Sequence, residues 1–473
     1  MKRILIVGGG ISGLAAAHRL LELEASLQIT LIEASSRLGG TLQTKERDGF
    51  LLEQGPDSFI SEKPQALELS KRLGLSSHLI ETNPKYRRSF LVRAGSLRPV
   101  PEGFQLLAPT RMWPFVTTDI FSWAGKVRMA GDLVLPRRRG NGTDDESLAN
   151  FVRRRLGNEA LNRMAQPMVG GIYTADPEML SLRATLPRFL DMERAERSII
   201  LAMWRKAREL RKETGNTSGV SGARYSLFLS FDRGMQTLVD KLAEELNSRG
   251  VSARLNSKVT SIAYDGTWQV ESSSGRIDAD AICLAVPSFI AGTLLAEVDP
   301  ELSSLLKQIQ YSSTATINLG YRRSQIGHPL NGFGFVVPYI EGRSLIACSF
   351  SSVKFAQRAP DDSVLLRAFV GGALQPEMLD LNNDEIVGRV KSDLNQLLSI
   401  EGEPIFTEVT RWERSMPQYL VGHLDLVDAI DSKVKMLPRL RLVGNAFRGA
   451  GIPDCIKSGE TAATQLFEML TNH

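Results

Sequence analysis

The stretch that decides the fold is Ile4-Leu-Ile-Val-Gly8-Gly9-Gly10-Ile11-Ser12-Gly13-Leu-Ala-Ala-Ala17. A short apolar run breaks into glycines and then into good helix formers, which is the order strand, tight turn, helix. Gly8, Gly10 and Gly13 have the spacing G-x-G-x-x-G, so the backbone can turn sharply, approach a pyrophosphate and pack helix on strand. The N–H groups at the helix N-terminus would face the phosphates. The stretch therefore predicts a dinucleotide-binding unit.

A carboxylate follows the second apolar run. Ile29–Ile32 ends at Glu33, about twenty residues after the glycines, where a carboxylate can bind the ribose 2′-hydroxyl and would repel a 2′-phosphate, which disfavours NADP. The continuation Glu33-Ala34-Ser-Ser-Arg37-Leu-Gly39-Gly40-Thr41 resembles the extension in flavoproteins of the amine oxidase and protoporphyrinogen oxidase superfamily, where an Arg and paired glycines approach the FAD. The combined pattern favours FAD over NAD and over an ordinary glycine turn.

Composition excludes several classes of protein. A chain of 473 residues predicts two or three domains, and 42% hydrophobic with 23% charged residues is ordinary for a globular protein. The formal charge of +4 is small for this length and does not indicate nucleic acid as a partner. The five histidines form no local cluster, so we expect no metal site.

The cysteines and the N-terminus bear on location. Cys283, Cys348 and Cys455 contain no C-x-x-C pair, and a sparse, odd set suits a reducing compartment. The apolar run after Lys2 and Arg3 enters the glycine turn too early for a signal peptide. No apolar run reaches the roughly eighteen residues of a membrane-spanning helix. We therefore expect a cytoplasmic protein.

The order of the patterns predicts discontinuous domains. Strand-like runs after the linker-like 215–222 resemble a return to the first domain, and a second series of strands begins near Ser288. We assign 1–85, 220–287 and 437–473 to an FAD-binding domain, and 86–100 with 288–436 to a substrate domain. The remaining ranges, 101–210 and 211–222, are assigned to a helical insertion and a linker.

The helical insertion leaves two alternatives open. Met112-Trp113-Pro-Phe115 and Phe121-Ser-Trp123 are rich in aromatic residues, and Arg137–Arg139 closes the segment. The combination fits an interfacial membrane patch or an insertion that buries its aromatics against a neighbouring domain.

Further along the insertion, two local features are predicted. Ser147 is predicted to cap a helix in which Arg153–Arg155 form a solvated basic face. Gly170-Gly171 is expected to break the helices where a ligand or backbone passes closely.

The C-terminal stretch is the second strong signal. Gly444-Asn-Ala-Phe-Arg-Gly449-Ala450-Gly451-Ile452-Pro453-Asp454-Cys455 places a helix N-terminus, with Pro in its first turn, after a glycine-rich loop. The N–H groups of such an end are suited to the flavin pyrimidine edge.

The chain closely resembles the oxygen-dependent protoporphyrinogen oxidase family almost end to end. The resemblance rests on the glycine fingerprint, on this C-terminal stretch, and on Gly55-Pro56-Asp57-Ser58, Gly171-Ile172-Tyr173, Gly332-Phe333-Gly334 and Met416-Pro417-Gln418-Tyr419. The resemblance implies an α/β and α+β fold: a p-hydroxybenzoate-hydroxylase-like FAD domain built from discontinuous segments, a mixed-sheet substrate domain and a helical inserted domain. By position it implies that FAD contacts Gly8, Gly9, Gly10, Ile11, Ser12, Gly13, Glu33, Ala34, Arg37, Gly40, Thr41, Gly55, Pro56, Asp57, Ser58, Val259, Trp412, Ala450, Gly451 and Ile452. In the flavoproteins that this chain resembles, the Gly55–Ser58 turn brings backbone N–H groups to the flavin ring; the alternative is a simple surface turn.

The resemblance also implies substrate contacts. Phe333 matches the aromatic that packs on the porphyrinogen ring, with Gly171 and Ile172 near the opposite face; the alternative for Phe333 is a plain strand aromatic. Where eukaryotic-type members have an arginine that meets a propionate, this chain has Ser89. Ser89 and Lys63 instead resemble the Gram-positive branch that oxidises coproporphyrinogen III. Its four propionates would suit a basic mouth, so we favour coproporphyrinogen over protoporphyrinogen.

The chemistry that follows needs no catalytic side chain. A porphyrinogen loses a hydride from a bridging carbon to flavin N5 and a proton from a pyrrole N–H, and O2 reoxidises the flavin with formation of H2O2. The protein supplies orientation and an apolar slot, and no general base is assigned. Expected partners are the porphyrinogen, O2, ferrochelatase and a peripheral membrane surface, for a monomer or a homodimer. Two rival functions are an amine oxidase and a non-catalytic flavin or porphyrin carrier.

Overall fold

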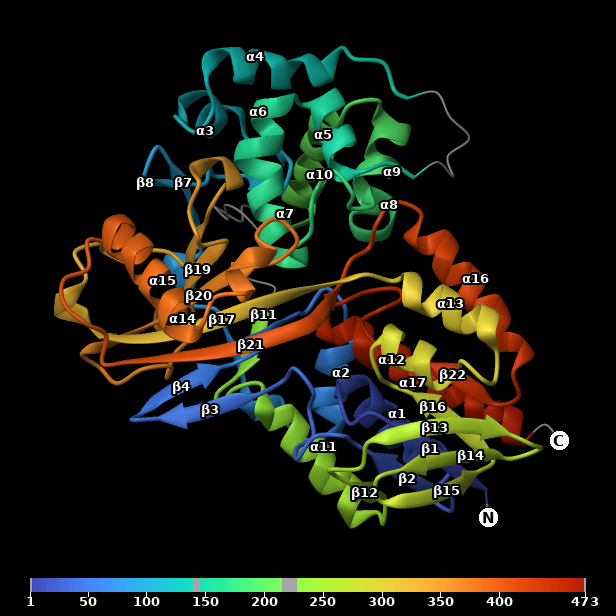
Figure 1. Ribbon diagram of the computed structural model, residues 1–473. Helices are drawn as coiled ribbons and strands as arrows, with labels where there is room; N and C mark the ends of the chain where they lie inside the picture. The colour runs from blue at the N-terminus through green and yellow to red at the C-terminus, as the bar shows by residue number, and fades with distance from the viewer. Residues whose placement is uncertain (1, 139–144, 215–227, 472–473) are drawn as a thin grey trace.

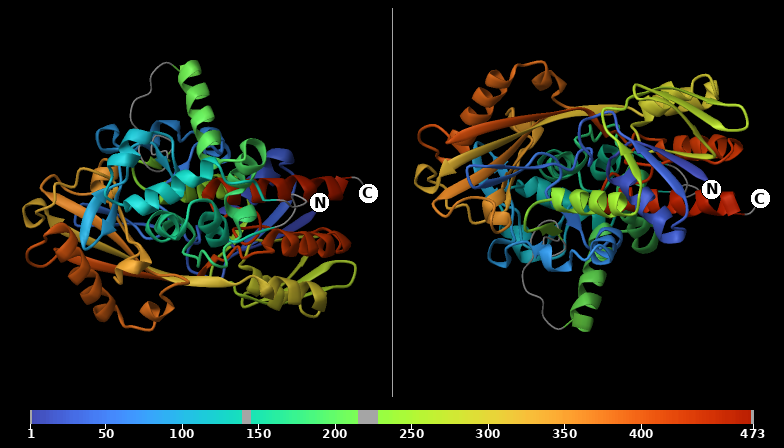
Figure 2. Two further views of the ribbon diagram at one scale, coloured as in Figure 1. Left: turned by 90° about the horizontal axis from the view of Figure 1, so that it is seen from above. Right: turned by 90° about the horizontal axis from the view of Figure 1, so that it is seen from below.

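The computed structural model describes residues 2–138, 145–214 and 228–471. Figure 1 shows a parallel sheet with its helices at the lower right, a larger mixed sheet at the left and a helical region above both. The predicted linker stretch 215–222 and Arg139 lie outside the described residues. Both chain ends lie beside the parallel sheet, and α10 (Ile199–Thr214) projects from the body in both views of Figure 2.

The parallel sheet gathers strands from distant parts of the sequence. Its order is β12-β2-β1-β16-β22, and all four pairings are parallel. The strands are β1 (Arg3–Val7), β2 (Gln28–Ile32), β12 (Ser252–Arg254), β16 (Ala281–Leu284) and β22 (Leu440–Leu442). Strands from the middle and the end of the chain thus join those of its first 32 residues in one sheet.

Side chains alternate between the two faces of this sheet, and each face belongs to a different apolar core. Ile4 and Ile6 pack with α1 (Ile11–Leu23), α2 (Gln65–Arg72), α11 (Gln236–Ser248) and α17 (Ile452–Thr471). Leu5 and Val7 pack with α12 (Ser288–Leu294), α13 (Pro300–Gln308), α16 (His423–Met436) and the small antiparallel sheet of β13 (Val259–Tyr264), β14 (Trp268–Ser272) and β15 (Gly275–Ala279). Three helices from 288–436 thus share a core with the parallel sheet.

The mixed sheet has the order β21-β17-β20-β19-β18-β7-β8, in which only the β18–β7 pair is parallel. Its strands are β7 (Phe90–Arg93), β8 (Ser96–Pro99), β17 (Tyr311–Arg322), β18 (Gly334–Val336), β19 (Ala347–Phe350), β20 (Ser363–Gly371) and β21 (Phe406–Pro417). One face is covered by α15 (Asn383–Leu398), whose Ile386, Val390 and Leu394 are buried. The predicted mixed sheet is confirmed.

Shorter elements connect the two sheets. A hairpin of β3 (Thr44–Arg47) and β4 (Phe50–Glu53) lies under the mixed sheet in Figure 1. A three-stranded sheet joins β5 (Phe59–Ile60), β11 (Phe228–Phe231) and β6 (Leu79–Glu81), and α14 (Ser351–Lys354) follows β19.

The helical region has its own apolar core. It contains α3 (Met112–Thr117), α4 (Trp123–Ala130), α5 (Leu148–Arg155), α6 (Asn158–Ala160), α7 (Gln166–Tyr173), α8 (Leu182–Thr185), α9 (Pro187–Glu196) and α10, with a short hairpin of β9 (Phe104–Gln105) and β10 (Ala108–Pro109). Phe104, Phe115 and Phe121 are buried, whereas Trp113 and Trp123 are 77% and 70% exposed. The burial alternative therefore holds for the three phenylalanines, and a membrane contact of the exposed tryptophans stays a prediction.

Two local predictions in this region are wrong. Arg155 is buried rather than solvated, because its guanidinium forms an ion pair with the buried Asp132 and donates to backbone carbonyls. Gly170 and Gly171 lie inside α7 and do not break it. The predicted cap of α5 is confirmed, since Asn150 N donates to Ser147 Oγ at 3.2 Å.

The model also bears on membrane spans. Across the ranges that the structure describes, no helix combines the length and apolar character of a membrane span.

Candidate flavin and substrate site

The glycine turn after β1 is packed tightly except at its middle glycine. A Cβ on Gly8, whose φ is +108°, would lie 2.4 Å from Ala285 O, and a Cβ on Gly13 would lie 2.0 Å from Gly8 O. At Gly10, by contrast, a Cβ would meet nothing within 4 Å. Gly8 and Gly13 thus allow close packing, while Gly10 leaves open space at the N-terminus of α1, as a bound pyrophosphate requires.

Glu33 lies against this turn. Its Oε2 accepts a hydrogen bond from Gly9 N at 2.7 Å, and its Oε1 accepts one from Ser35 N at 2.8 Å. Ser257 N donates to Glu33 O at 2.8 Å, so the chain that leads to Val259 runs along Glu33 and Ala34. The residues predicted to bind the pyrophosphate and the ribose are therefore adjacent, and the chain that leads to Val259 lies beside them.

Arg37 has a different environment from the one that the resemblance implies. Its guanidinium donates to the carbonyls of Leu38, Gly40 and Leu42, at 2.9 Å for Leu38 and 3.0 Å for Leu42. The side chain therefore fixes the loop that carries Gly40 and Thr41. A direct contact of Arg37 with FAD stays a prediction.

That loop joins the glycine turn to the Gly55–Ser58 turn. Gly39 N donates to Gly9 O at 2.8 Å, and a Cβ on Gly55 would lie 1.8 Å from Thr41 O. Only glycine at position 55 permits this approach. From the mixed sheet, Trp412 Nε1 donates to Gln54 O at 2.9 Å, which brings Trp412 beside Gly55.

The loop after β22 is held by a buried aromatic pair. Tyr419 Oη donates to Asn445 O at 2.5 Å and accepts from Gly449 N at 2.9 Å. The ring of His423 stacks on Tyr419 at 4.1 Å, and its Nε2 lies 2.7 Å from Phe447 O, which requires the tautomer that donates from Nε2. Burial lowers the pKa of His423. The neutral ring thus supports the loop that leads to Ala450.

The helix that follows reaches the first glycine turn. A Cβ on Gly459 of α17 would lie 2.2 Å from Ser12 O of α1, so the two helices cross in backbone contact. Ala450, Gly451 and Ile452 form the start of α17, and Gly459 lies two turns into it. The residues predicted for FAD, from the first to the last segment, thus form one connected surface.

The predicted substrate residues form two groups. In the first, Phe333 N donates to Arg88 O at 2.9 Å, next to Ser89, and a Cβ on Gly171 would lie 3.7 Å from Val336 of β18. Phe333 and Ser89 are buried, and among the described residues Ser89 Oγ has no hydrogen-bond partner.

The second group lies at the start of α17. Lys63 Nζ contacts the Asp454 carboxylate at 2.6 Å, and the side chains are 52% and 18% exposed. Burial raises the pKa of Tyr173 to about 12, and the charge of Asp454 adds to this shift, so the end of α7 lies near the pair. Ile172, which is 48% exposed, belongs to that same helix end.

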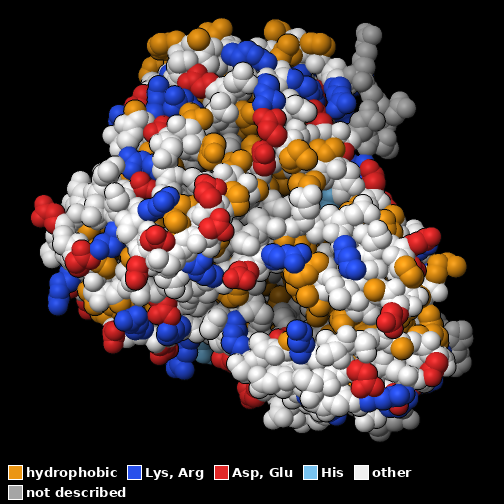
Figure 3. All heavy atoms as spheres, viewed as in Figure 1, with side chains coloured by type: hydrophobic (Ala, Val, Ile, Leu, Met, Phe, Trp, Pro, Cys, Tyr) orange, Lys and Arg blue, Asp and Glu red, His pale blue; other side chains and the backbone are white. Residues whose placement is uncertain are grey.

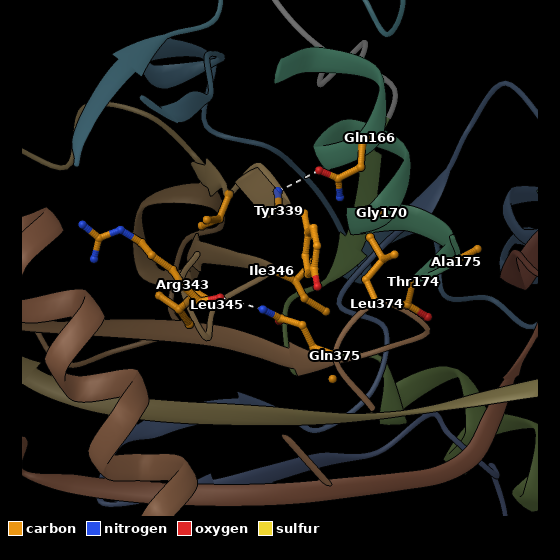
Figure 4. A pocket seen from close by; sticks show the side chains of 12 residues that line it. Gln166, Gly170, Thr174, Ala175, Tyr339, Arg343, Leu345, Ile346, Leu374 and Gln375 are labelled. Carbon is orange, nitrogen blue, oxygen red and sulfur yellow. Dashed lines mark hydrogen bonds between the residues drawn. The ribbon is translucent and has the colours of Figure 1, made fainter. Parts of the chain in front are cut away.

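Two hollows lie outside these groups. Figure 4 shows the first, between α7 and the mixed sheet, where Gln166 Oε1 accepts from Tyr339 N and Gln375 Nε2 donates to Arg343 O. Its volume of about 30 Å³ holds only one or two water molecules, so a macrocycle does not fit there. The second, about 500 Å³, is lined by polar residues such as His78, Asp240 and Lys241, and by none of the predicted site residues.

Sequence reasoning missed the cations that hold the Gly55–Ser58 turn. Lys354 Nζ lies 2.8 Å from Asp57 Oδ2, and Arg367 donates to Gly55 O. Burial alone would raise the pKa of Asp57, but Lys354 and then Arg367 hold it well below its usual range. One signal was present: Arg367 interrupts the apolar run Val364-Leu-Leu-Arg367-Ala-Phe-Val370, and a charge inside a strand-like run indicates a buried partner.

The chain matches the family model of flavin-containing amine oxidoreductases over residues 11–467. The chain belongs to this family. It is 36% identical to coproporphyrinogen III oxidase of Bacillus subtilis, with 99% of this chain and 98% of that protein covered. It is 29% identical to chloroplastic protoporphyrinogen oxidase of Nicotiana tabacum, over 99% of this chain and 86% of that protein. A solved structure from Exiguobacterium sp. 255-15, provisionally described as a protoporphyrinogen oxidase, superposes with a TM-score of 0.86 at 31% identity, over 98% of each chain.

The family membership confirms several predictions. The protein is an oxidoreductase that uses FAD, and its fold is that of the FAD-dependent oxidases of this family. The open space at Gly10 between tightly packed glycines fits this cofactor. The individual FAD and substrate contacts stay predictions, and the geometry above brings their residues together without testing them one by one.

Proposed function

We propose that the protein oxidises a porphyrinogen to the porphyrin in haem biosynthesis, and that its substrate is coproporphyrinogen III. The supporting observation is that three relatives named coproporphyrinogen III oxidase are 32–37% identical over at least 98% of this chain, whereas plant protoporphyrinogen oxidases are 28–30% identical. The alternative substrate for the same site is protoporphyrinogen IX.

In the proposed reaction the cofactor would transfer the electrons, and the protein would bind and orient the substrate. When bound, FAD would accept a hydride from the substrate and pass the electrons to O2, giving H2O2, and three such two-electron oxidations would convert the porphyrinogen to the porphyrin. The N-termini of α1 and α17 would present backbone N–H groups and positive dipole ends to the cofactor. Phe333 and Ile172 would confine the macrocycle so that a bridging carbon faces the flavin, since orientation is the main contribution that the protein makes to such a reaction.

The Lys63–Asp454 pair refines the expectation of a basic mouth. Lys63 already has a carboxylate partner at 2.6 Å, and it is half exposed. A substrate propionate would therefore have to replace Asp454 as the partner of Lys63, because Lys63 is not a free cation. An exposed pair of this kind is worth about 1 kcal/mol or less, so such an exchange has a small cost.

The deciding experiment is aerobic turnover of the purified yellow protein with coproporphyrinogen III and protoporphyrinogen IX, followed by porphyrin fluorescence and by peroxide. We expect a higher kcat/KM for coproporphyrinogen III. A preference for protoporphyrinogen IX would contradict the substrate but keep the reaction. Absence of turnover with both would contradict the proposal, and polyamine oxidation or porphyrin binding without turnover would then be tested.

We propose further that the protein resides in the cytoplasm and contacts a membrane surface peripherally through the face that carries Trp113 and Trp123. In Figure 3 hydrophobic side chains alternate with Lys and Arg along the upper edge, over α3 and α4. Co-sedimentation with anionic vesicles tests this contact, and substitution of both tryptophans by Ser should abolish it. We also propose that the protein, as a monomer or a homodimer, transfers its product directly to ferrochelatase. Size-exclusion chromatography of the two enzymes together tests this contact.

A further inference from the structure

The mixed sheet and β11 together hold the segment Glu53–Asp57 by hydrogen bonds to its backbone. Asn318 Nδ2 donates to Glu53 O at 3.2 Å, Trp412 Nε1 donates to Gln54 O at 2.9 Å, and Arg367 donates to Gly55 O. Ser230 Oγ, from β11, donates to Asp57 O at 2.7 Å. The backbone of the predicted flavin turn is thus positioned by side chains that lie far away in the sequence.

These donors share one face of the sheet because of its register. Asn318 of β17 pairs directly with Arg367 of β20, and Thr314 of the same strand β17 pairs with Trp412 of β21. Residues 314 and 318 of one strand point to the same face. The sheet therefore presents a fixed row of donors to the turn, in which Arg367 is the charged member.

A cluster of charged side chains lies behind the turn. Three cations, Lys354, Arg358 and Arg367, face Glu53 and Asp57 at distances down to 2.8 Å. A third carboxylate, Asp232, interacts with Arg358, but its side chain is 30% exposed and also pairs with His78. Arg358 and Arg367 are 2% and 4% exposed. Burial raises the pKa of Glu53 to about 7, so near neutral pH even its compensating charge is incomplete. When Glu53 is protonated, the cations of the cluster therefore outnumber its charged carboxylates.

Arg367 also keeps an unused donor. In the part of the chain that the structure describes, its Nε has no hydrogen-bond partner although it is buried. Arg367 shares the Asp57 carboxylate with Lys354, so its charge is only partly compensated, and a further anionic group beside a buried cation offsets the cost of burying it. The turn that Arg367 holds is the one predicted to meet the flavin ring, and a charge close to the ring tunes its electronics.

We propose that Arg367 is a positioning residue that fixes the Gly55–Ser58 turn for the flavin and supplies a buried positive charge that stabilises negative charge on the bound ring. This inference rests on the predicted contact between that turn and FAD. Lys354 shares the role through Asp57, whereas Arg358 binds the carbonyls of Phe231 and Asp232 at 2.7 and 3.0 Å.

The test uses the holoenzyme and sulfite, an anion whose adduct places negative charge on the flavin and bleaches its visible absorbance. Arg367→Met should weaken sulfite binding at least tenfold and make the two-electron reduction potential more negative, by about 30 mV for each tenfold change. Arg367→Lys should restore most of the sulfite affinity. Asp57→Asn, which increases the net positive charge, should strengthen sulfite binding at least threefold.

The matched control is Arg411→Met. Arg411 lies on β21 of the same sheet, but its guanidinium binds Asn383 and the carbonyls of Leu379 and Leu381 instead of the turn. We expect its sulfite affinity to stay within twofold of the wild type. If Arg367→Met fails to fold, Lys354→Met replaces it and should weaken sulfite binding at least threefold.

Unchanged sulfite affinity and potential in Arg367→Met would overturn the inference. Weaker binding in both Arg367→Met and Asp57→Asn would also overturn it, since a purely structural role predicts losses of the same sign. A wild-type protein that binds FAD but oxidises neither porphyrinogen would contradict the proposed function and leave this comparison intact.

Discussion

At the scale of single residues, Glu53 connects the flavin turn to the helix beneath it. Its buried carboxyl accepts from Met235 N at 2.8 Å, just before α11, and from Thr44 Oγ1 at 2.9 Å. Burial raises its pKa from 4.5 to about 7, and these two hydrogen bonds offset only part of that effect. Glu53 is therefore a titrating group inside the fold, close to neutral pH.

We predict that Glu53 makes the protein less stable as the pH rises. The unfolded carboxyl ionises near pH 4.5 and the folded one near 7, so between these values the folded chain binds more protons and stability falls with pH, by up to about 3 kcal/mol. The variant Glu53→Gln has no ionisable group at this position, so its stability lacks this dependence on pH. The Tm advantage of the variant over the wild type should grow between pH 5 and pH 8 in thermal melts. Parallel melting curves across that range would contradict the prediction.

At the scale of an element, the three consecutive arginines of α5 have three different environments. Arg153 is 39% exposed and pairs with Glu178, Arg154 binds Glu146 and Glu193, and Arg155 is buried against Asp132. Asp132 also accepts from Ser198 Oγ at 2.6 Å and from Ile200 N at 3.1 Å. The helix is thus fixed in the helical region by its own charges.

Removal of the buried partner should be costly. Arg155→Met leaves the Asp132 carboxylate buried without its cation, which we expect to lower the free energy of unfolding by about 3–5 kcal/mol. Arg153→Met, two residues earlier in α5 and partly exposed, should change it by less than about 1 kcal/mol. Urea unfolding followed by near-UV circular dichroism compares them. Equal effects of the two substitutions would show that Arg155 does not anchor α5.

The loop before α17 gives a second prediction at this scale. Tyr419→Phe removes the hydroxyl that binds Asn445 O and Gly449 N, and each buried group left unpaired costs about 1–3 kcal/mol. If this loop contributes to FAD binding, the Kd for FAD should rise about tenfold or more, since 1.4 kcal/mol is a factor of ten. The control is Tyr321→Phe, whose buried hydroxyl has no partner among the described residues and should be dispensable. Equal FAD affinities in the two variants would contradict the role of the loop.

At the scale of the whole molecule, the glycine fingerprint and the C-terminal loop were predictable because their information is local: backbone conformation and helix N-termini depend on neighbouring residues. The donors to the Gly55–Ser58 turn were not predictable in this way. Arg367 acts on Gly55 across 312 positions of sequence, and only the register of β17, β20 and β21 brings them together. The same limit explains the error at Arg155, whose partner Asp132 lies 23 residues earlier on a different element.

The discontinuity of the site should couple FAD binding to the stability of the whole chain. The predicted contacts run from Gly8 to Ile452, and the segments that carry them bind one another through Gly9, Thr41, Gln54 and Ser12. A ligand at 100 times its Kd stabilises the folded state by about 2.7 kcal/mol. With an unfolding entropy of about 1 kcal/mol/K for a chain of 473 residues, this corresponds to a rise in Tm of about 3 °C.

The measurement is differential scanning fluorimetry of the apoprotein with added FAD, and with riboflavin at the same concentration as the control. Riboflavin lacks the pyrophosphate and adenosine, so Gly10 and Glu33 would have no partner, and we expect a much smaller shift. Equal shifts with both ligands would show that the first glycine turn does not hold the cofactor. A Tm that does not respond to FAD at all would contradict the coupling, because a ligand that bridges the first and last segments must stabilise the fold that brings them together.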